Sequence, residues 1–362
     1  MVYNEVMIFT ELEGKEFRKF EQKCPFGNLY QMSERAEVRA NMGWDARILG
    51  VKDGDKIVAG CLVLARRGVM LVQMGGVMDW SDLKVVRFWL RGLVDYAKTT
   101  GNYALEVYPP LKLSIRDNTG AILEEFDQKK VYGLFAEAGF KYLGKTTAID
   151  PKANRWVTCK DLSGFKTEDE IRASYKKNVR NKLRKHSPEL EIVEVTSDED
   201  IEQVAFAIEG SNEKNGQKSR DHSYYRYIRD AFGSQVHFVL ARRREDGKTV
   251  AGRVIFDHPN ETISFISGTV QEFRQMNAMT VLQDDLLTKC FKKGIKRVNF
   301  YGMAGDFSPA NHLLEFKSGF GIKVEEYIGG FRLVLKPGKY YRARFATKAR
   351  GAAGRVKRLI KK

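Results

Sequence analysis

The chain has 362 residues, 43% of them hydrophobic and 11% aromatic, and its formal net charge is +16. That length accommodates two globular domains with complete cores. The longest uninterrupted apolar run, about nine residues from Ile57 to Ala65, is far shorter than the roughly 20 residues that cross a bilayer, which argues against a transmembrane helix.

The N-terminus and the cysteines narrow the class of protein further. Residues 1–17 carry acidic side chains where a signal peptide has a basic patch and an apolar region, so we expect a cytoplasmic protein. The cysteines are scattered and have no histidine at ligand spacing, so neither a metal site nor a disulfide framework is predicted. We expect all four to be buried small residues: Cys24, Cys61, Cys159 and Cys290.

The first half predicts an α/β unit. Residues 1–110 hold the signals of two strand hairpins and two helices. Residues 111–120, which follow two prolines, predict a loop. Residues 129–150 then predict a helix, a Gly-Phe pair and a strand that complete the unit.

The second half begins after a linker at 151–154. Residues 171–185 predict one helix, because apolar residues recur there at helical spacing while the other faces are strongly basic. Strand signals follow in two pairs, 236–241 with 250–256, and 262–267 with 297–301.

A last helix is predicted near the end of the second half. Ser308 and Pro309 resemble an N-cap and first-turn pair, and Gly319 is expected to stop the helix that they start. Eleven Lys or Arg and no acidic residue follow between Lys336 and Lys362.

The two halves repeat one another. The tripeptide Val58-Ala59-Gly60 recurs as Val250-Ala251-Gly252, and Gly76 recurs as Gly268, at an offset of 192; Tyr108 recurs as Tyr301 at 193. Each copy reads hairpin, helix, strand, helix, Gly-Phe, strand. This order predicts an α/β fold with a mixed sheet in each half.

Such a unit resembles the acetyltransferase-like, or acyl-CoA N-acyltransferase, fold. Members that use coenzyme A have a glycine-rich turn before the main helix, because backbone N–H groups must approach the pyrophosphate. Residues 78–83 and 273–279 occupy the two equivalent turns and lack those glycines. A coenzyme A donor is therefore disfavoured in both halves, and we expect no cofactor.

At the level of motifs, the chain resembles the Fem family of peptidoglycan bridge-forming aminoacyltransferases. The matching stretches occur in order over essentially the whole chain: N28-L-Y-Q-M32, G76-V-M-D79, S219-R-D-H-S-Y-Y225, R297-V-N-F-Y-G-M-A-G-D-F307, L314-E-F-K-S-G-F320 and E326-Y-I-G-G-F331. The resemblance implies tandem acyltransferase-like domains at 1–150 and 151–321. The last strand, near 327–335 within a returning segment at 322–343, would complete the first domain.

Larger family members insert a two-helix coiled-coil arm between two strands of the second domain. Residues 242–248 leave room only for a tight hairpin at that junction, so no arm is expected. The resemblance implies transfer of an amino acid from aminoacyl-tRNA to a stem-peptide amine of a UDP-linked or lipid-linked peptidoglycan precursor.

The resemblance also implies site residues. Lys317 matches a family lysine in a Phe-Lys pair close to the transfer chemistry, where a cation stabilises the oxyanion of the tetrahedral intermediate. The alternative for Lys317 is a solvated helix-surface lysine. Phe316 shares the motif, and packing is its simpler role. Asp306 is either a carboxylate near the site or a helix cap.

Three further residues match positions that hold the sugar-diphosphate part of the precursor: Arg220, Tyr224 and Arg39. An arginine binds two phosphate oxygens at once, and a tyrosine hydroxyl adds a donor. Asp221 could instead pair with Arg220. Arg39 is the weakest match, because Arg35 stands where some members carry a tryptophan.

Two basic segments fit nucleic acid or membrane. The helix at 172–185 could follow tRNA phosphates, or it could be an ordinary solvated face. The tail at 344–362 places an apolar stripe beside its cations, which suits RNA or an anionic membrane at the inner face of the bilayer. Two alternatives to the aminoacyltransferase stay open: a coenzyme A-dependent N-acyltransferase with one degenerate domain, and a non-enzymatic RNA-binding protein.

Overall fold

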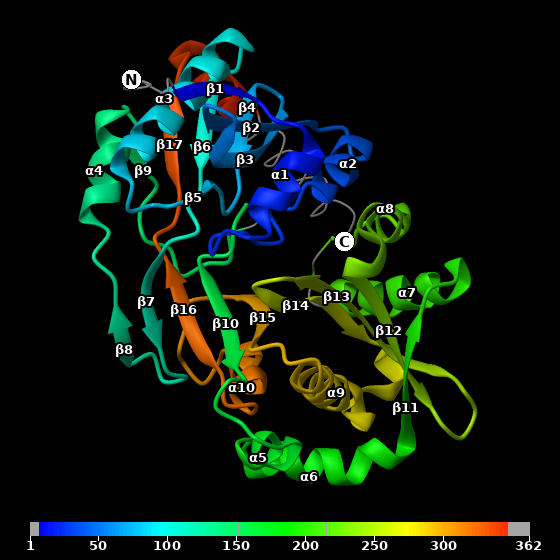
Figure 1. The fold of residues 1–362 in the computed structure, drawn as a ribbon. Helices are drawn as coiled ribbons and strands as arrows, with labels where there is room; N and C mark the ends of the chain where they lie inside the picture. The colour runs from blue at the N-terminus through cyan, green and yellow to red at the C-terminus, as the bar shows by residue number, and fades with distance from the viewer. Residues whose placement is uncertain (1–6, 151, 215, 217, 347–362) are drawn as a thin grey trace.

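Two mixed β-sheets lie one above the other, and the chain passes from one sheet to the other more than once (Figure 1). The computed structural model describes residues 7–150, 152–214, 216 and 218–346. In spatial order the first sheet contains β1 (Met7–Glu11), β2 (Asp45–Asp53), β3 (Lys56–Arg66), β4 (Val69–Val72), β6 (Ala104–Val107), β17 (Phe331–Val334) and β9 (Lys141–Tyr142), with β5 (Val77–Met78) paired to β3. The second contains β11 (Leu190–Val195), β12 (Val236–Arg243), β13 (Thr249–His258), β14 (Glu261–Thr269), β15 (Arg297–Met303), β10 (Trp156–Asp161), β16 (Lys323–Tyr327), β7 (Lys112–Arg116) and β8 (Ile122–Glu125).

Helices cover both sheets. They are α1 (Gly14–Glu21), α2 (Glu34–Asn41), α3 (Leu83–Thr99), α4 (Lys129–Glu137), α5 (Glu168–Ala173), α6 (Lys177–His186), α7 (Asp198–Lys214), α8 (Ser223–Phe232), α9 (Ala278–Lys292) and α10 (His312–Ser318), with short 3₁₀ turns at Ser187–Glu189, Gly233–Gln235 and Gln271–Met276. Residues 337–346 are also helical. In the part of the chain that the structure describes, no helix has the length and apolar character to span a bilayer.

The predicted repeat is confirmed. The two Val-Ala-Gly segments lie in β3 and β13, the main helices are α3 and α9, and each sheet has one parallel pair at the equivalent place, β4 with β6 and β14 with β15. Gly252 and Gly268 face each other across β13 and β14. A Cβ on Gly252 would lie 2.8 Å from Val204 Cα in α7, and one on Gly268 would lie 2.3 Å from the Ala207 carbonyl oxygen. The repeated glycines therefore let α7 pack directly on the sheet.

Successive side chains of a strand point to opposite faces of the second sheet, and helices pack on both faces. Val254 and Phe256 of β13 pack among residues of α7 and α8, whereas Ala251 and Ile255 pack among residues of α9. Figure 1 shows α7 and α8 on one side of these strands and α9 on the other. We call these the α8 face and the α9 face.

The predicted loop at 111–120 is wrong. Residues 112–116 form β7, which pairs with β16, and β8 continues the hairpin. The two prolines end the preceding segment but do not prevent the next residues from adding to the open edge of the second sheet. The predicted division of the chain into domains at residues 150 and 321 stays a prediction.

Two predicted helices have different boundaries. The single helix predicted for 171–185 is broken at 174–176 into α5 and α6, because Lys176 has extended φ/ψ angles and its N–H donates to the Gly319 carbonyl. The helix stopped by Gly319 begins at His312, and its N-cap is Asn311, whose side chain accepts from the Leu314 N–H. Ser308 and Pro309 are wrong as its cap.

The last strands alternate between the sheets. Tyr327 belongs to β16 in the second sheet, and the chain then crosses to β17, which lies between β6 and β9 in the first. The expected strand near 327–335 therefore joins the first sheet only from Phe331. The junction between β12 and β13 is a short connection at 244–248, as predicted. Of the cationic tail, residues 347–362 lie outside the described part of the chain.

Candidate active site

The parallel strands β14 and β15 pair at only two positions, Thr262 with Val298 and Ile263 with Asn299. Beyond those pairs a cavity of about 670 Å³ opens between the strands. Its walls include 264–267 of β14 and 300–302 of β15, together with residues from both faces of the sheet. The cavity therefore connects the α8 face with the α9 face.

A bulge in β15 turns two consecutive carbonyl groups toward Lys317. The register with β10 shifts between Val157 and Cys159, and Tyr301 has a φ of 68°, in the left-handed region. The Lys317 Nζ donates to the Tyr301 oxygen at 3.1 Å and to the Gly302 oxygen at 2.9 Å. A lysine ammonium has three donors, so one remains for a ligand in the cavity.

Burial defines the electrostatics of Lys317. Its side chain is only 6% exposed, so it is not the solvated surface lysine of the alternative prediction. Burial lowers the pKa of the ammonium to about 7. Phe316, the other half of the motif, lines the same cavity and packs on Phe320 with ring centroids 5.5 Å apart.

Arginines gather on the α8 face of the cavity. Arg39 on α2, Arg220 just before α8 and Tyr224 in the first turn of α8 all line it, although α2 and α8 are far apart in the sequence. The Arg220 guanidinium lies over the ring of Tyr224, at 4.9 Å, and over that of Phe265, at 5.3 Å. Burial and the charge of Arg220 lower the pKa of Arg39. The structure thus brings the three sugar-diphosphate candidates of the sequence together.

Arg35 adds a third guanidinium to this cluster. It is 8% exposed, its Nη2 donates to Gln73 Oε1 at 2.7 Å, and it stacks on Tyr30 at 4.6 Å. Its Nη1 is buried without a hydrogen-bond partner among the described residues. Burial and the neighbouring Arg39 lower the pKa of Arg35 to about 10. Buried guanidinium groups that lower one another's pKa favour an anion in the cavity.

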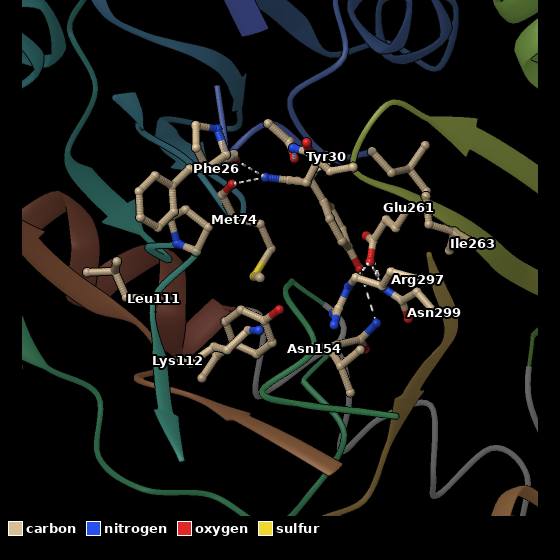
Figure 2. A pocket seen from close by; sticks show the side chains of 18 of the residues that line it. Phe26, Tyr30, Met74, Leu111, Lys112, Asn154, Glu261, Ile263, Arg297 and Asn299 are labelled. Carbon is tan, nitrogen blue, oxygen red and sulfur yellow. Dashed lines mark hydrogen bonds and ion pairs between the residues drawn. The ribbon is translucent and has the colours of Figure 1, made fainter. Parts of the chain in front are cut away.

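A second cavity, of about 490 Å³, adjoins the first (Figure 2). The two cavities share four wall residues: Leu29, Tyr30, Asn154 and Tyr301. The hydroxyls of Tyr30 and Tyr301 lie 2.7 Å apart, and Asn154 Nδ2 donates to the Tyr30 oxygen at 3.2 Å. Hydrogen-bonded side chains therefore separate the two cavities.

Charges in the second cavity are paired with one another. Arg297 donates to Glu261 at 2.8 Å and, through both Nη atoms, to Glu325 at 2.6 and 2.7 Å. Lys112 also pairs with Glu325, at 2.9 Å. The arginine and the lysine lower the pKa of Glu325 to about 2, against the effect of burial. Figure 2 shows Glu261 and Arg297 on the side of the cavity opposite the apolar Phe26, Met74 and Leu111, with Lys112 beside Leu111.

Two acidic residues of the sequence analysis are not part of the cavity. Asp306 is exposed, and its carboxylate accepts from the N–H and the hydroxyl of Ser308 in the turn before α10. Asp221 accepts from the Ser223 N–H, and the ion pairs of the described residues include none between Asp221 and Arg220. Both carboxylates thus stabilise a local turn and cap no helix, since the N-cap of α10 is Asn311 and that of α8 is His222.

Sequence reasoning missed three of the residues that shape the cavity. Tyr30, Tyr301 and Arg253 all line it. Tyr30 and Tyr301 fall within the family-like motifs, and Tyr301 repeats Tyr108, so those motifs carried a signal. Arg253 directly follows the repeated Val-Ala-Gly, where the first copy has Cys61. A charged residue in one copy of the repeat, at a position where the other copy has an apolar residue, is the signal that could have identified Arg253 as a cavity residue.

Comparison with known proteins agrees with this architecture. The model of the FemAB family matches residues 12–245 and 242–348. The chain is 24% identical to the aminoacyltransferase FemB of Staphylococcus epidermidis, over 92% of this chain and 97% of that protein. It is 21% identical to the aminoacyltransferase FemA of Staphylococcus aureus, over 91% and 95%.

Solved structures share the fold. The crystal structure of FemX superposes with a TM-score of 0.77 at 18% identity and covers 92% of this chain and 99% of its own. A tandem GNAT protein from the clavulanic acid biosynthesis pathway gives 0.55 at 11% identity, over 91% and 98%. Both sheets of this chain are therefore of the acetyltransferase-like type that the sequence predicted.

Proposed function

This chain belongs to the FemAB family, and we propose that it is an aminoacyltransferase that adds an amino acid to a stem-peptide amine of a peptidoglycan precursor. The donor is aminoacyl-tRNA. The acceptor amine attacks the ester carbonyl carbon, a C–N bond forms, and the C–O bond to the ribose breaks. The departing ribose oxygen takes the proton that the amine loses, so no strong protein base is required.

The observation that carries this proposal is the buried Lys317 at the opening between β14 and β15. Two carbonyls hold its Nζ, and one donor stays free toward the cavity. A cation fixed in a desolvated site stabilises the negative oxygen of a tetrahedral intermediate without reorganisation. Developing negative charge also favours the protonated form of a lysine whose pKa lies near 7.

The α8 face supports the acceptor assignment. Arg35 and Arg39 of α2 and Arg220 of the segment before α8 provide guanidinium groups from separate parts of the chain, an arrangement suited to the two phosphates of a precursor. Tyr224 adds a hydroxyl on the same side. We therefore assign the diphosphate to this cluster and the reacting amine to the opening beside Lys317.

The α9 face supports the donor assignment. Helix α6 packs on α9 and begins beside Gly319, two residues after Lys317. Its outward side chains are exposed and form no ion pairs with described residues: Lys177, Arg180, Lys182, Arg184 and Lys185. A cationic helix in this position can bind the phosphates of a tRNA acceptor stem while the 3′ end enters the cavity. The cationic tail is proposed to bring the enzyme to an anionic membrane.

The test is a product assay with defined donors and acceptors. The protein is incubated with a mixture of charged tRNAs and with the soluble and the lipid-linked precursor, and the products are weighed. We expect a mass increase of one or more amino acid residues on one precursor. Acetyl-coenzyme A in place of charged tRNA should give none, and acetylation of the precursor would overturn the proposal.

A further inference from the structure

The α9 face of the cavity holds a guanidinium without a counter-ion. Arg253 of β13 is 1% exposed, and its Nη1 donates to the Leu282 carbonyl at 2.8 Å. Its Nε has no hydrogen-bond partner, and no carboxylate of the described residues forms an ion pair with it. The carboxylate of Asp285, whose charge reaches Arg253, is paired with Lys289 at 2.9 Å.

A second unpartnered donor lies in the same part of the cavity. Gln283, the residue after Leu282 on α9, is 2% exposed, and its Nε2 has no partner among the described residues. Both Arg253 and Gln283 line the cavity. A buried charge and a buried amide without partners are costly, and a ligand oxygen would remove that cost.

Arg253 and Gln283 lie on the α9 face of the cavity, whereas the arginine cluster lies on the α8 face. Arg253 lies between Gly252, which faces α7, and Val254, which packs on the α8 face, so alternation directs Arg253 to the α9 face. Its hydrogen bond to Leu282 of α9 agrees with that direction. Met279, Phe300 and Phe316 also line the cavity and belong to the core packed on the α9 face.

We propose that Arg253 and Gln283 form an anion subsite, distinct from the arginine cluster, that binds a phosphate of the 3′ end of the aminoacyl donor. The anion site stands on the unpartnered donors, whereas its assignment to the donor rests on the proposed function. A carboxylate of the acceptor peptide has the same chemistry and is the other source of such an anion.

The test compares stability with ligand affinity. Arg253→Met removes an unpaired buried charge, so we expect a melting temperature equal to or above that of the wild type. Its affinity for an aminoacylated RNA minihelix should fall about 10- to 100-fold, as for a lost hydrogen bond to a charged group. Affinity for the soluble precursor should stay unchanged. Gln283→Leu should weaken RNA binding less.

The matched control is Arg155→Met. Arg155 is also buried, at 4% exposed, but its Nη2 pairs with Glu326 at 2.9 Å, and it lines neither cavity. This variant should lower the melting temperature and leave RNA affinity unchanged. A loss of stability in Arg253→Met equal to that in Arg155→Met, with full RNA affinity, would show that Arg253 is structural. Loss of precursor affinity instead of RNA affinity would overturn the assignment to the donor.

Inorganic phosphate tests the anion site even if the protein binds no aminoacylated RNA. In an Arg220→Ala background, phosphate should still raise the melting temperature. In the Arg220→Ala/Arg253→Met protein that increase should be much smaller. Equal protection of the two proteins would overturn the anion subsite, while absence of RNA binding by the wild type would overturn only the proposed donor.

Discussion

The hydroxyl of Tyr30, which precedes α2, lies 2.7 Å from the hydroxyl of Tyr301 in β15, and the two rings are stacked with centroids 6.4 Å apart. The pair separates the two cavities. It also connects the first half of the chain to the strand whose carbonyls hold Lys317. Tyr301 therefore takes part both in the contact between the two halves of the chain and in the geometry of the candidate site.

The first prediction concerns this contact. Tyr30→Phe and Tyr301→Phe each remove one partner of the same hydrogen bond, so their effects should not add. We expect a coupling of about 0.5–1.5 kcal/mol in a double-mutant cycle, measured by denaturant unfolding. Strictly additive effects would mean that the hydroxyls do not interact in solution.

The second prediction concerns Lys317→Met. Because one oxyanion-type donor is lost, turnover should fall by about 100-fold or more, with little change in precursor affinity. Lys160→Met is the matched control. Lys160 is also buried, and its Nζ donates to Ser174 and to the Phe320 carbonyl, but it lines neither cavity. The control should lose stability but not turnover. Near-normal turnover of folded Lys317→Met would contradict the assignment.

The third prediction concerns pH and stability. Burial lowers the pKa of Lys317 to about 7 in the folded protein, from about 10.4 in an unfolded chain. Between those values the unfolded state binds more protons, so this lysine makes the protein more stable as pH rises. Lys317→Met lacks that contribution. Its melting temperature relative to the wild type should be most favourable below about pH 7 and should fall steadily toward about pH 10. A difference independent of pH would contradict the lowered pKa.

The fourth prediction concerns Arg220→Ala. Loss of a bidentate phosphate contact should weaken precursor binding by about 1.5–3 kcal/mol, measured by calorimetry, and Tyr224→Phe should do less. Arg226 lies on α8, close to Arg220 in the sequence, pairs with Glu202 and lines neither cavity, so Arg226→Ala serves as the control with unchanged affinity. A phosphate-free precursor analogue should bind the wild type and Arg220→Ala equally. If Arg220→Ala still distinguishes the two ligands as the wild type does, the phosphate assignment is wrong.

The fifth prediction concerns the cationic tail. Truncation after Ala346 keeps every described residue, including the helix at 337–346, and removes seven Lys or Arg. Because a cation near an anionic surface contributes roughly 1 kcal/mol, the truncated protein should no longer sediment with anionic liposomes. Activity on a membrane-embedded precursor should be lost and activity on a soluble analogue kept. A parallel loss of both activities and of tRNA affinity would identify the tail as an RNA-binding element.

Local patterns in the sequence were sufficient for much of the fold. The repeated Val-Ala-Gly, the helical spacing before Gly101 and Gly294, and the paired strand signals predicted a mixed sheet in each half and the order of the repeated elements along the chain. Such patterns report the period of a strand or helix and the face that it buries, which depend on residues close together in the chain. The same reasoning failed at 111–120, because the strand there forms only by pairing with β16, about two hundred residues later.

The sequence by itself also indicated some of the chemical groups of the candidate site, since the Phe316-Lys317 motif and Arg220 stand in recognisable segments. Only the tertiary structure decided that Lys317 is buried against the Tyr301 and Gly302 carbonyls, and that Arg35 and Arg39 reach the same cavity as Arg220. Whether a side chain is buried, how its pKa is shifted and whether it has a hydrogen-bond partner all depend on the residues that surround it. Those surroundings come from elements far apart in the chain, so no local pattern contains them.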